Sequence, residues 1–152
     1  MRSKLIFLAS AVLLVVVTGL IVAQQREAKA TVTVYKTPTC GCCSKWVDHL
    51  REAGFEVETR DLKDLSSIKA QYGVQRAFSS CHTGIVEGYV VEGHVPAEHV
   101  ARLLEERPDV AGITVPGMPI GSPGMEGPNP QPYEVLSFDK AGHTEVFARV
   151  VP

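Results

Sequence analysis

The chain has 152 residues, of which 45% are apolar and 21% are charged, and its formal net charge is −2. This composition is that of an ordinary globular protein and excludes a collagen-like, coiled-coil or wholly disordered chain. It contains no basic run interleaved with aromatic residues, so no nucleic-acid partner is expected.

The N-terminus is predicted to be a targeting segment. Two basic residues precede residues 5–23, which are uncharged and long enough to span a bilayer. Residues 28–30 have the small-x-small form of a cleavage site. We therefore expect residues 1–30 to be a cleaved signal peptide or a retained membrane anchor. In both cases residues 31–152 form one domain outside the cytoplasm, because the positive end of such a segment stays inside.

The exported part begins with the pattern of a βαβ unit. Residues 31–35 are β-branched and aromatic, which is typical of a strand. Apolar residues then recur at helical spacing over 43–53, and residues 55–60 alternate like a second strand. Because a helix separates the two strands, we expect them to pair in parallel.

The next segments continue the alternation of helices and strands. The patterns predict a helix over 65–72, a loop over 74–80, strands over 82–86 and 89–92, and a helix that begins at Pro96.

The last third of the chain departs from this pattern. Residues 115–132 are rich in proline and glycine and are predicted to be a loop. Residues 133–138 and 144–150 then read as a terminal hairpin. The order of elements before the loop is that of thioredoxin and glutaredoxin. We therefore predict an α/β, thioredoxin-like fold (βαβ–α–ββα) with an appended Pro/Gly-rich loop and a C-terminal β-hairpin.

The four cysteines are the residues with the clearest chemistry. Cys40, Cys42 and Cys43 open the first helix, where the helix dipole favours thiolate over thiol. Cys81 precedes the strand at 82–86, a position that a cis-proline normally holds beside the C-x-x-C pair of thioredoxin-like folds. Such crowding indicates a shared site rather than a disulfide framework. Four thiolates suit Cu(I) or Zn(II), and bridging thiolates can hold more than one Cu(I).

Other interpretations of the cysteines stay open. Cys40 and Cys43 form a C-x-x-C pair, so the protein could be a thiol–disulfide oxidoreductase that uses them, or they could form a structural disulfide. A zinc-stabilised domain is a further alternative, although the C-x-C-C spacing is unlike that of common zinc sites.

Histidines and methionines near the cysteines are weaker candidates. His82 adjoins Cys81, but successive strand residues face opposite sides, so His82 is interpreted as a surface residue. His94 lies in a predicted loop and is a candidate for contact with the ligands. Four further donors are interpreted as solvated or as loop packing, with a thioether cover over Cu(I) left open: His49, His99, Met118 and Met125.

Three runs carry a resemblance to a known family: VYKTPTCGCCSKW, SSCHTGIVEGYVVEGHVPAEHV, and VPGMPIGSPGMEG followed by PYEVL. Together they resemble the CopG-type periplasmic copper-resistance proteins, over about residues 32–150. The resemblance implies a thioredoxin-like fold and a multicopper cluster bridged by Cys40, Cys42, Cys43 and Cys81.

The leading hypothesis is therefore a periplasmic Cu(I)-binding protein for copper resistance that binds more than one ion. The resemblance also implies copper redox chemistry, and whether the protein is a copper-dependent oxidoreductase stays open. Expected partners are copper ions and other periplasmic copper-handling proteins, with membrane contact only through a retained segment 5–23.

Overall fold

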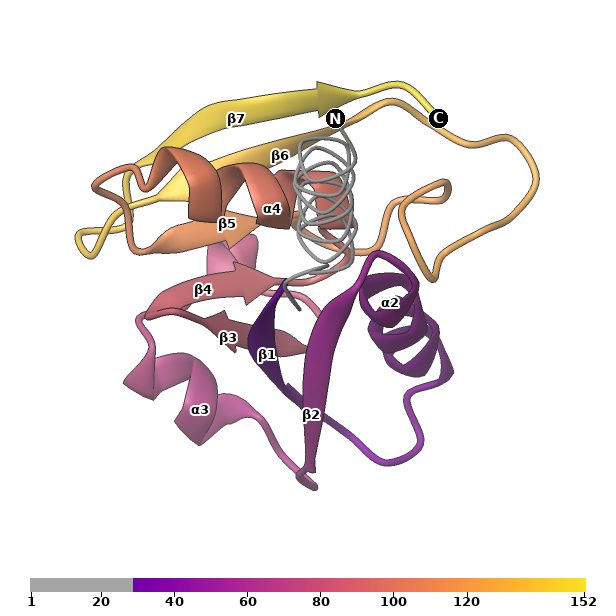
Figure 1. The fold of residues 1–152 in the computed structure, drawn as a ribbon, viewed down its shortest axis with the longest axis horizontal. Helices are drawn as coiled ribbons and strands as arrows, with labels where there is room; N and C mark the ends of the chain where they lie inside the picture. Colours follow the sequence, from indigo (N-terminus) through magenta and orange to yellow (C-terminus); the bar gives the residue numbers. More distant parts are fainter. Residues whose placement is uncertain (1–28) are drawn as a thin grey trace, which may run out of the picture.

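The body of the molecule is one mixed sheet with helices on both faces (Figure 1). The computed structural model describes residues 29–152, and within them seven strands follow the order β2-β1-β3-β4-β5-β6-β7. The bounds of the described elements are β1 (Lys29–Lys36), α2 (Gly41–Glu52), β2 (Phe55–Asp61), α3 (Ser66–Gln71), η1 (Arg76–Phe78), β3 (Thr83–Val86), β4 (Tyr89–Glu92), α4 (Ala97–Glu106), β5 (Gly112–Thr114), β6 (Tyr133–Phe138) and β7 (Thr144–Val150).

The predicted βαβ unit is present. β1 and β2 pair in parallel, and α2 connects them. α2 begins two residues earlier than the apolar spacing suggested, because Cys40 acts as its N-cap and its sulfur accepts the backbone N–H of Cys43 at 3.3 Å. Gly54, with a φ of 89°, follows the end of the helix. The cysteine run therefore sits at the point where the chain turns from strand into helix.

The middle of the sheet brings the second half of the thioredoxin-like unit against β1. β3 pairs antiparallel with both β1 and β4. Glu87 and Gly88 join β3 to β4 with positive φ at both positions, which is the geometry of a tight hairpin turn. This arrangement confirms the α/β, thioredoxin-like fold that the sequence predicts.

The terminal hairpin is also confirmed, but it is joined to the sheet by a strand that the sequence did not reveal. β5 pairs in parallel with β4 and antiparallel with β6. The hairpin of β6 and β7 therefore continues the central sheet. α4 begins at Ala97, with Pro96 as the N-cap rather than as the first helical residue.

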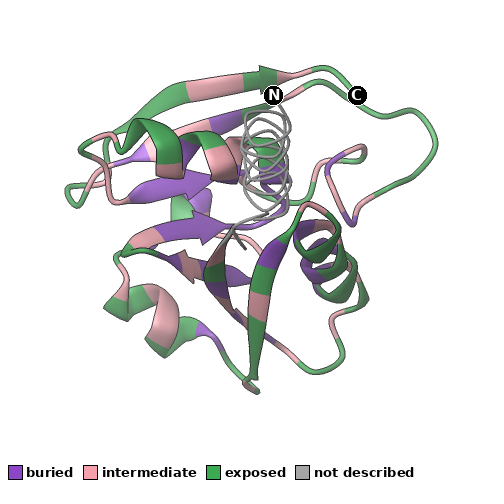
Figure 2. Ribbon diagram, in the orientation of Figure 1, coloured by how far each residue is buried: buried purple, intermediate pink, exposed green. Residues whose placement is uncertain are grey.

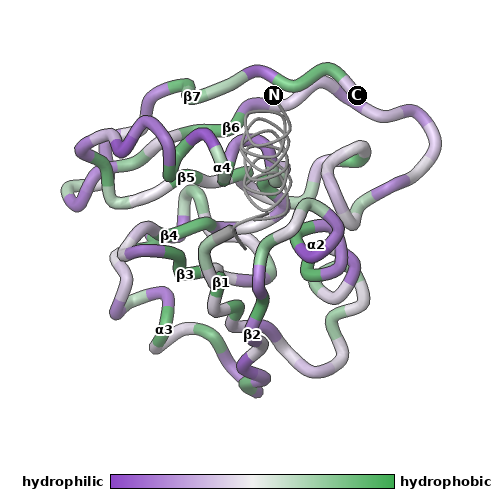
Figure 3. The backbone as a smooth tube through the Cα atoms, in the orientation of Figure 1, coloured by the Kyte–Doolittle hydropathy of each residue, from purple (hydrophilic) through white to green (hydrophobic). Residues whose placement is uncertain are grey.

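Two apolar clusters cover the two faces of the sheet. Figure 2 shows that the inner strands hold many of the buried positions. The larger cluster joins α2 and α4 to the sheet and includes Trp46, Val91 and Leu103. The smaller cluster lies on the other face and includes Phe78 and Val90. Val90 and Val91 belong to different clusters because successive strand residues face opposite sides. Figure 3 shows hydrophobic positions along the inner strands of the sheet.

The loop over 115–132 has no helix or strand, as predicted, and runs past the N-terminal end of α2 (Figure 1). Its backbone comes very close to that helix at Gly124, where an added Cβ would lie 2.6 Å from the carbonyl oxygen of Cys42.

The predicted targeting segment at residues 5–23 lies outside the described residues. Within residues 29–152, none of the helices has the length and hydropathy needed to cross a membrane.

Candidate metal centre

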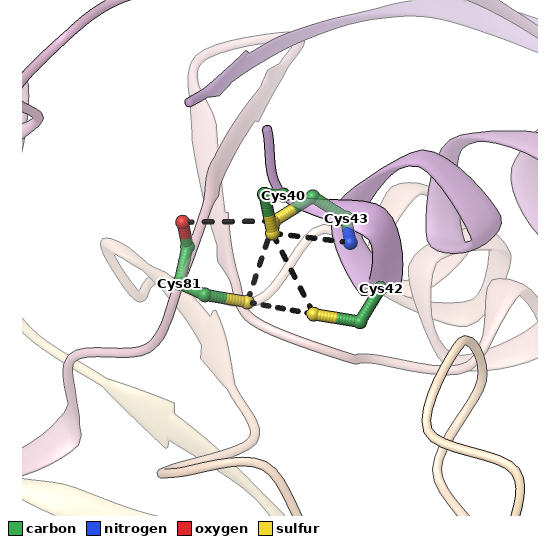
Figure 4. A group of neighbouring side chains, drawn as sticks. All are labelled: Cys40, Cys42, Cys43 and Cys81. Carbon is green, nitrogen blue, oxygen red and sulfur yellow. Dashed lines mark hydrogen bonds between the residues drawn. A yellow bond between two sulfur atoms is a disulfide. The ribbon is translucent and has the colours of Figure 1, made fainter. Parts of the chain in front are cut away.

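The four cysteines meet at one place, although 38 residues of sequence separate Cys43 from Cys81 (Figure 4). Their sulfur atoms lie within 4.8 Å of one another. The Sγ of Cys42 is 3.5 Å from that of Cys40 and 3.9 Å from that of Cys81, and the Sγ of Cys43 is 3.5 Å from that of Cys81. The juxtaposition predicted from the thioredoxin-like topology is therefore present.

Two of the four cysteines are joined to each other. Cys40 and Cys43 form a disulfide, while Cys42 and Cys81 carry free thiols. This pairing is the one that the C-x-x-C spacing allows, and it was one of the alternatives left open by the sequence. The site is therefore described in its oxidised form, with two sulfurs bonded and two available.

The free thiol of Cys81 is protonated in this environment. Burial raises the pKa of the Cys81 thiol to about 12, and the neighbouring Cys42 thiol adds to that shift. Cys81 Sγ lies 3.1 Å from Nε2 of His94 and 3.3 Å from Nδ1 of His82, so the thiol has an imidazole nitrogen on two sides.

The interpretation of His82 as a surface residue, made from strand alternation, is wrong. Its side chain is fully buried (0% exposed), and its ring lies 4.3 Å from that of Trp46 and 4.8 Å from that of His94. β3 begins only at Thr83, so Cys81 and His82 precede the strand and alternation does not separate their side chains. The Nε2 atom of His82 is buried and has no hydrogen-bond partner among the described residues.

His94 is held in place by the Pro/Gly-rich loop. Its Nδ1 lies 2.8 Å from the carbonyl oxygen of Pro123. A carbonyl can only accept, so Nδ1 carries the proton and the lone pair of Nε2 faces Cys81. Burial lowers the pKa of His94, which favours this neutral form. The loop thereby presents a nitrogen donor beside the sulfur cluster.

An exposed ion pair joins the loop to the start of α2. The N–H of Gly124 donates to the Glu126 carboxylate at 2.6 Å, and Glu126 pairs with Lys45 at 3.5 Å. Of the two methionines in this loop, Met118 is 51% exposed and Met125 is partly buried.

Two other histidines are less solvated than the sequence suggested. His49 and His99 are both partly buried. Nε2 of His49 accepts the backbone N–H of Ala97 at 3.0 Å and so caps the N-terminus of α4. Trp46 is fully buried in the core, and its Nε1 donates to Val95 O at 2.8 Å.

The donor set is chemically soft. When the disulfide is reduced, the centre offers four sulfurs, and His82 and His94 form a second group of candidate ligands together with Cys81. Sulfur and imidazole donors suit Cu(I), Zn(II) and related ions, and they do not suit Mg(II) or Ca(II). The sequence named His94 as a candidate for contact with the ligands, and its Nε2 lies beside Cys81. It missed His82, because the segment around Cys81 is irregular and no strand alternation applies to it.

Comparison with known proteins agrees with the fold and the site. Residues 32–77 match the glutaredoxin family model, and residues 78–125 match the family described as "Protein of unknown function, DUF411". Among curated proteins, none matches this chain. Two solved structures titled "Copper resistance protein copG", Form 2 and Form 1, match with TM-scores of 0.76. Their sequences are 41% and 40% identical to this chain. The matches cover 80% and 81% of this chain and 98% of each of the two solved chains.

These features define a glutaredoxin-like protein whose C-x-x-C position is enlarged into a cluster of four cysteines. With that identity over nearly the whole length of those structures, the chain belongs to the CopG copper-resistance protein family.

Proposed function

We propose that this protein binds copper as Cu(I) through Cys40, Cys42, Cys43 and Cys81, and that it acts in copper resistance outside the cytoplasm. The observation that carries the proposal is the convergence of four sulfur atoms within 4.8 Å. The solved relatives are titled copper resistance proteins, which favours copper over zinc as the cargo.

The spacing of the sulfurs fits shared metal binding. For metal–sulfur bonds of about 2.3 Å and tetrahedral angles, two sulfurs on one ion lie about 3.8 Å apart. Three of the non-bonded sulfur pairs are 3.5 to 3.9 Å apart, and all four sulfurs lie within 4.8 Å of one another. Four thiolates at this spacing can bridge neighbouring ions, so we expect more than one Cu(I) per chain. Nδ1 of His82 and the lone pair of His94 Nε2, at 3.3 and 3.1 Å from Cys81 Sγ, would supply nitrogen donors at the same place.

The disulfide makes reduction a condition for full loading. Cys40 and Cys43 offer no thiolate while they are bonded to each other. Their two thiolates can in turn be oxidised by two Cu(II) ions, which gives one disulfide and two Cu(I) ions. Copper redox chemistry is therefore part of the proposal.

A second candidate function is thiol–disulfide oxidoreduction, favoured by the Cys40–Cys43 disulfide at the N-terminus of α2. In that scheme Cys40 is the attacking thiol and Cys43 resolves the mixed disulfide. Cys42 and Cys81 would have no required role, and metal would not be needed.

Metal analysis separates the candidates. The full chain is reduced under anaerobic conditions, loaded with Cu(I), and freed of weakly bound ions by a chelator. Copper above one equivalent is the expected result, with the exposed His143→Gln as a matched control that should not change it. Disulfide reductase activity without bound copper would instead support the second candidate, and one stoichiometric zinc in place of copper would overturn the proposal.

A further inference from the structure

A buried ion pair lies behind Cys81, on the α3 side of the sheet. Glu92 is the last residue of β4, and its side chain is fully buried (0% exposed). Lys69 of α3 pairs with its carboxylate, and the Lys69 side chain is 15% exposed. A buried ion pair is by itself weak evidence of stabilisation, because desolvation offsets the attraction between the charges. A role for the Glu92–Lys69 pair must therefore be sought in the other contacts that the two side chains make.

Both oxygens of the Glu92 carboxylate are engaged. Oε1 accepts the backbone N–H of Ser80 at 2.6 Å as well as the Lys69 ammonium. Oε2 accepts the hydroxyl of Thr83 at 2.7 Å, and Lys69 also donates to that hydroxyl at 3.1 Å. Thr83 faces Glu92 across the β3–β4 ladder, so the carboxylate is fixed to a rigid part of the sheet.

The residue that this carboxylate holds comes directly before Cys81. Ser80 and Cys81 belong to no helix or strand, so no regular ladder fixes their backbone. Three contacts do so instead. The first is the bond from Ser80 N–H to Glu92. The second runs from the Ser80 hydroxyl to the carbonyl oxygen of Gly117 at 2.5 Å. The third runs from the Gly93 N–H to the carbonyl oxygen of His82 at 3.1 Å.

We propose that Glu92, with Lys69 as its counter-ion, is a positioning residue that fixes the sulfur of Cys81 among the other three cysteines. This inference rests on the proposed function, because it concerns the same copper site. Ligand distances in a metal site are held to within about 0.2 Å, so a small shift of the Ser80–Cys81 backbone weakens binding.

Two substitutions at Glu92 test this role in the full chain. Glu92→Leu removes the acceptor for Ser80 N–H. It should lower Cu(I) affinity about 10- to 100-fold, the range for partners that orient metal ligands, without reducing copper content at saturation. Glu92→Gln keeps an oxygen for Ser80 but leaves Lys69 without a counter-ion. Adding Lys69→Met to it should restore most of the affinity. Affinity is measured by competition with a Cu(I) chelator, together with the ultraviolet copper–thiolate absorption.

A second readout needs no copper. In the oxidised protein the free thiols of Cys42 and Cys81 lie 3.9 Å apart, so a monoarsenical that bridges two thiols should react with them rapidly. Glu92→Leu should slow this bridging, whereas the control Glu134→Gln, in an exposed pair with Arg149, should not. If Glu92→Leu does not fold, the same measurements on Glu92→Gln test the positioning role.

The outcomes separate the two proposals. Wild-type affinity, copper–thiolate absorption and bridging rate in folded Glu92 variants would overturn the positioning role while leaving copper binding intact. A wild-type chain that binds no copper would overturn the proposed function, and the bridging rates would still test Glu92.

Discussion

At the scale of single residues, Cys81 is set apart by its distance in sequence and by its neighbours. Its sulfur lies 3.5 Å from Cys43 and 3.9 Å from Cys42, and it alone also contacts two imidazole nitrogens. We predict that Cys81→Ser lowers bound copper as severely as Cys40→Ser, because each removes one of four shared thiolates. Copper per chain, measured on reduced and reloaded protein, checks this. Unchanged copper in Cys81→Ser would show that the site is confined to the C-x-C-C run.

Cys42 separates metal binding from dithiol catalysis. Its thiol is free while Cys40 and Cys43 are bonded, so Cys42→Ser should leave that disulfide able to form. Loss of one soft donor leaves Cu(I) under-coordinated, and bound copper should fall. Thiol titration of the oxidised variant and copper analysis of the reduced variant are the two measurements. Full copper binding together with strong disulfide reductase activity would favour the oxidoreductase instead.

The residue scale also shows where sequence reasoning stops. The meeting of the four cysteines could be predicted from their spacing and from the thioredoxin-like order of elements. His82 was misjudged because strand alternation was applied to a residue that precedes the strand. The orientation of His94 depends on a hydrogen bond to Pro123, 29 residues further along the chain in an irregular loop. No periodic pattern encodes such a contact.

At the scale of elements, the loop over 115–132 is held against α2 by a glycine. Gly124 has a φ of 84°, and a Cβ there would lie 2.6 Å from Cys42 O and 3.0 Å from Trp46 N. We predict that Gly124→Ala destabilises the fold by about 2–4 kcal/mol, from the positive φ and from overpacking against backbone. It should also displace Pro123 and so release His94. Urea unfolding measures the first effect, and Cu(I) affinity measures the second.

Gly117 is the matched control in the same loop. Its φ is 70°, but a Cβ there meets nothing within 4 Å. Gly117→Ala should therefore cost only the conformational part, about 1–2 kcal/mol. If the two variants lose equal stability, the close approach at Gly124 has no energetic importance.

β5 was not predicted from the sequence because it is too short. Gly112–Thr114 is three residues long, so it cannot display an alternating pattern. All three of its residues are buried between β4 and β6, and a Cβ at Gly112 would collide with Val90. The longer segments had clear periods and were predicted with the correct type, while β5 exists only because two neighbouring strands pair with it.

At the scale of the whole molecule, the compartment stays a prediction. We propose that the protein is exported to the periplasm, because residues 5–23 are uncharged and follow basic residues. Deleting them should leave the protein in the cytoplasm. The mass of the mature protein distinguishes cleavage, which gives a chain that begins near Thr31, from a retained inner-membrane anchor. Finding the full chain in the cytoplasm would contradict the proposed compartment.

More of the fold than of the site could be predicted, because helices and strands produce periodic patterns of apolar residues in the sequence. The sequence did not reveal β5, the strand that joins the terminal hairpin to the rest of the seven-stranded sheet. Spacing alone also could not decide whether Cys40 and Cys43 form a disulfide or remain free thiols. Redox state depends on the surroundings of the protein as well as on its sequence.

The two edge strands of the sheet determine whether molecules of this protein can associate by pairing their strands. β2 and β7 are the outermost strands, and each leaves one row of backbone donors and acceptors unpaired within the described sheet. Both strands expose charged side chains, among them Glu58 and Arg60 on β2 and Glu145 and Arg149 on β7. Charges at such positions disfavour the addition of another strand. The charged edges thereby protect the domain from edge-to-edge aggregation.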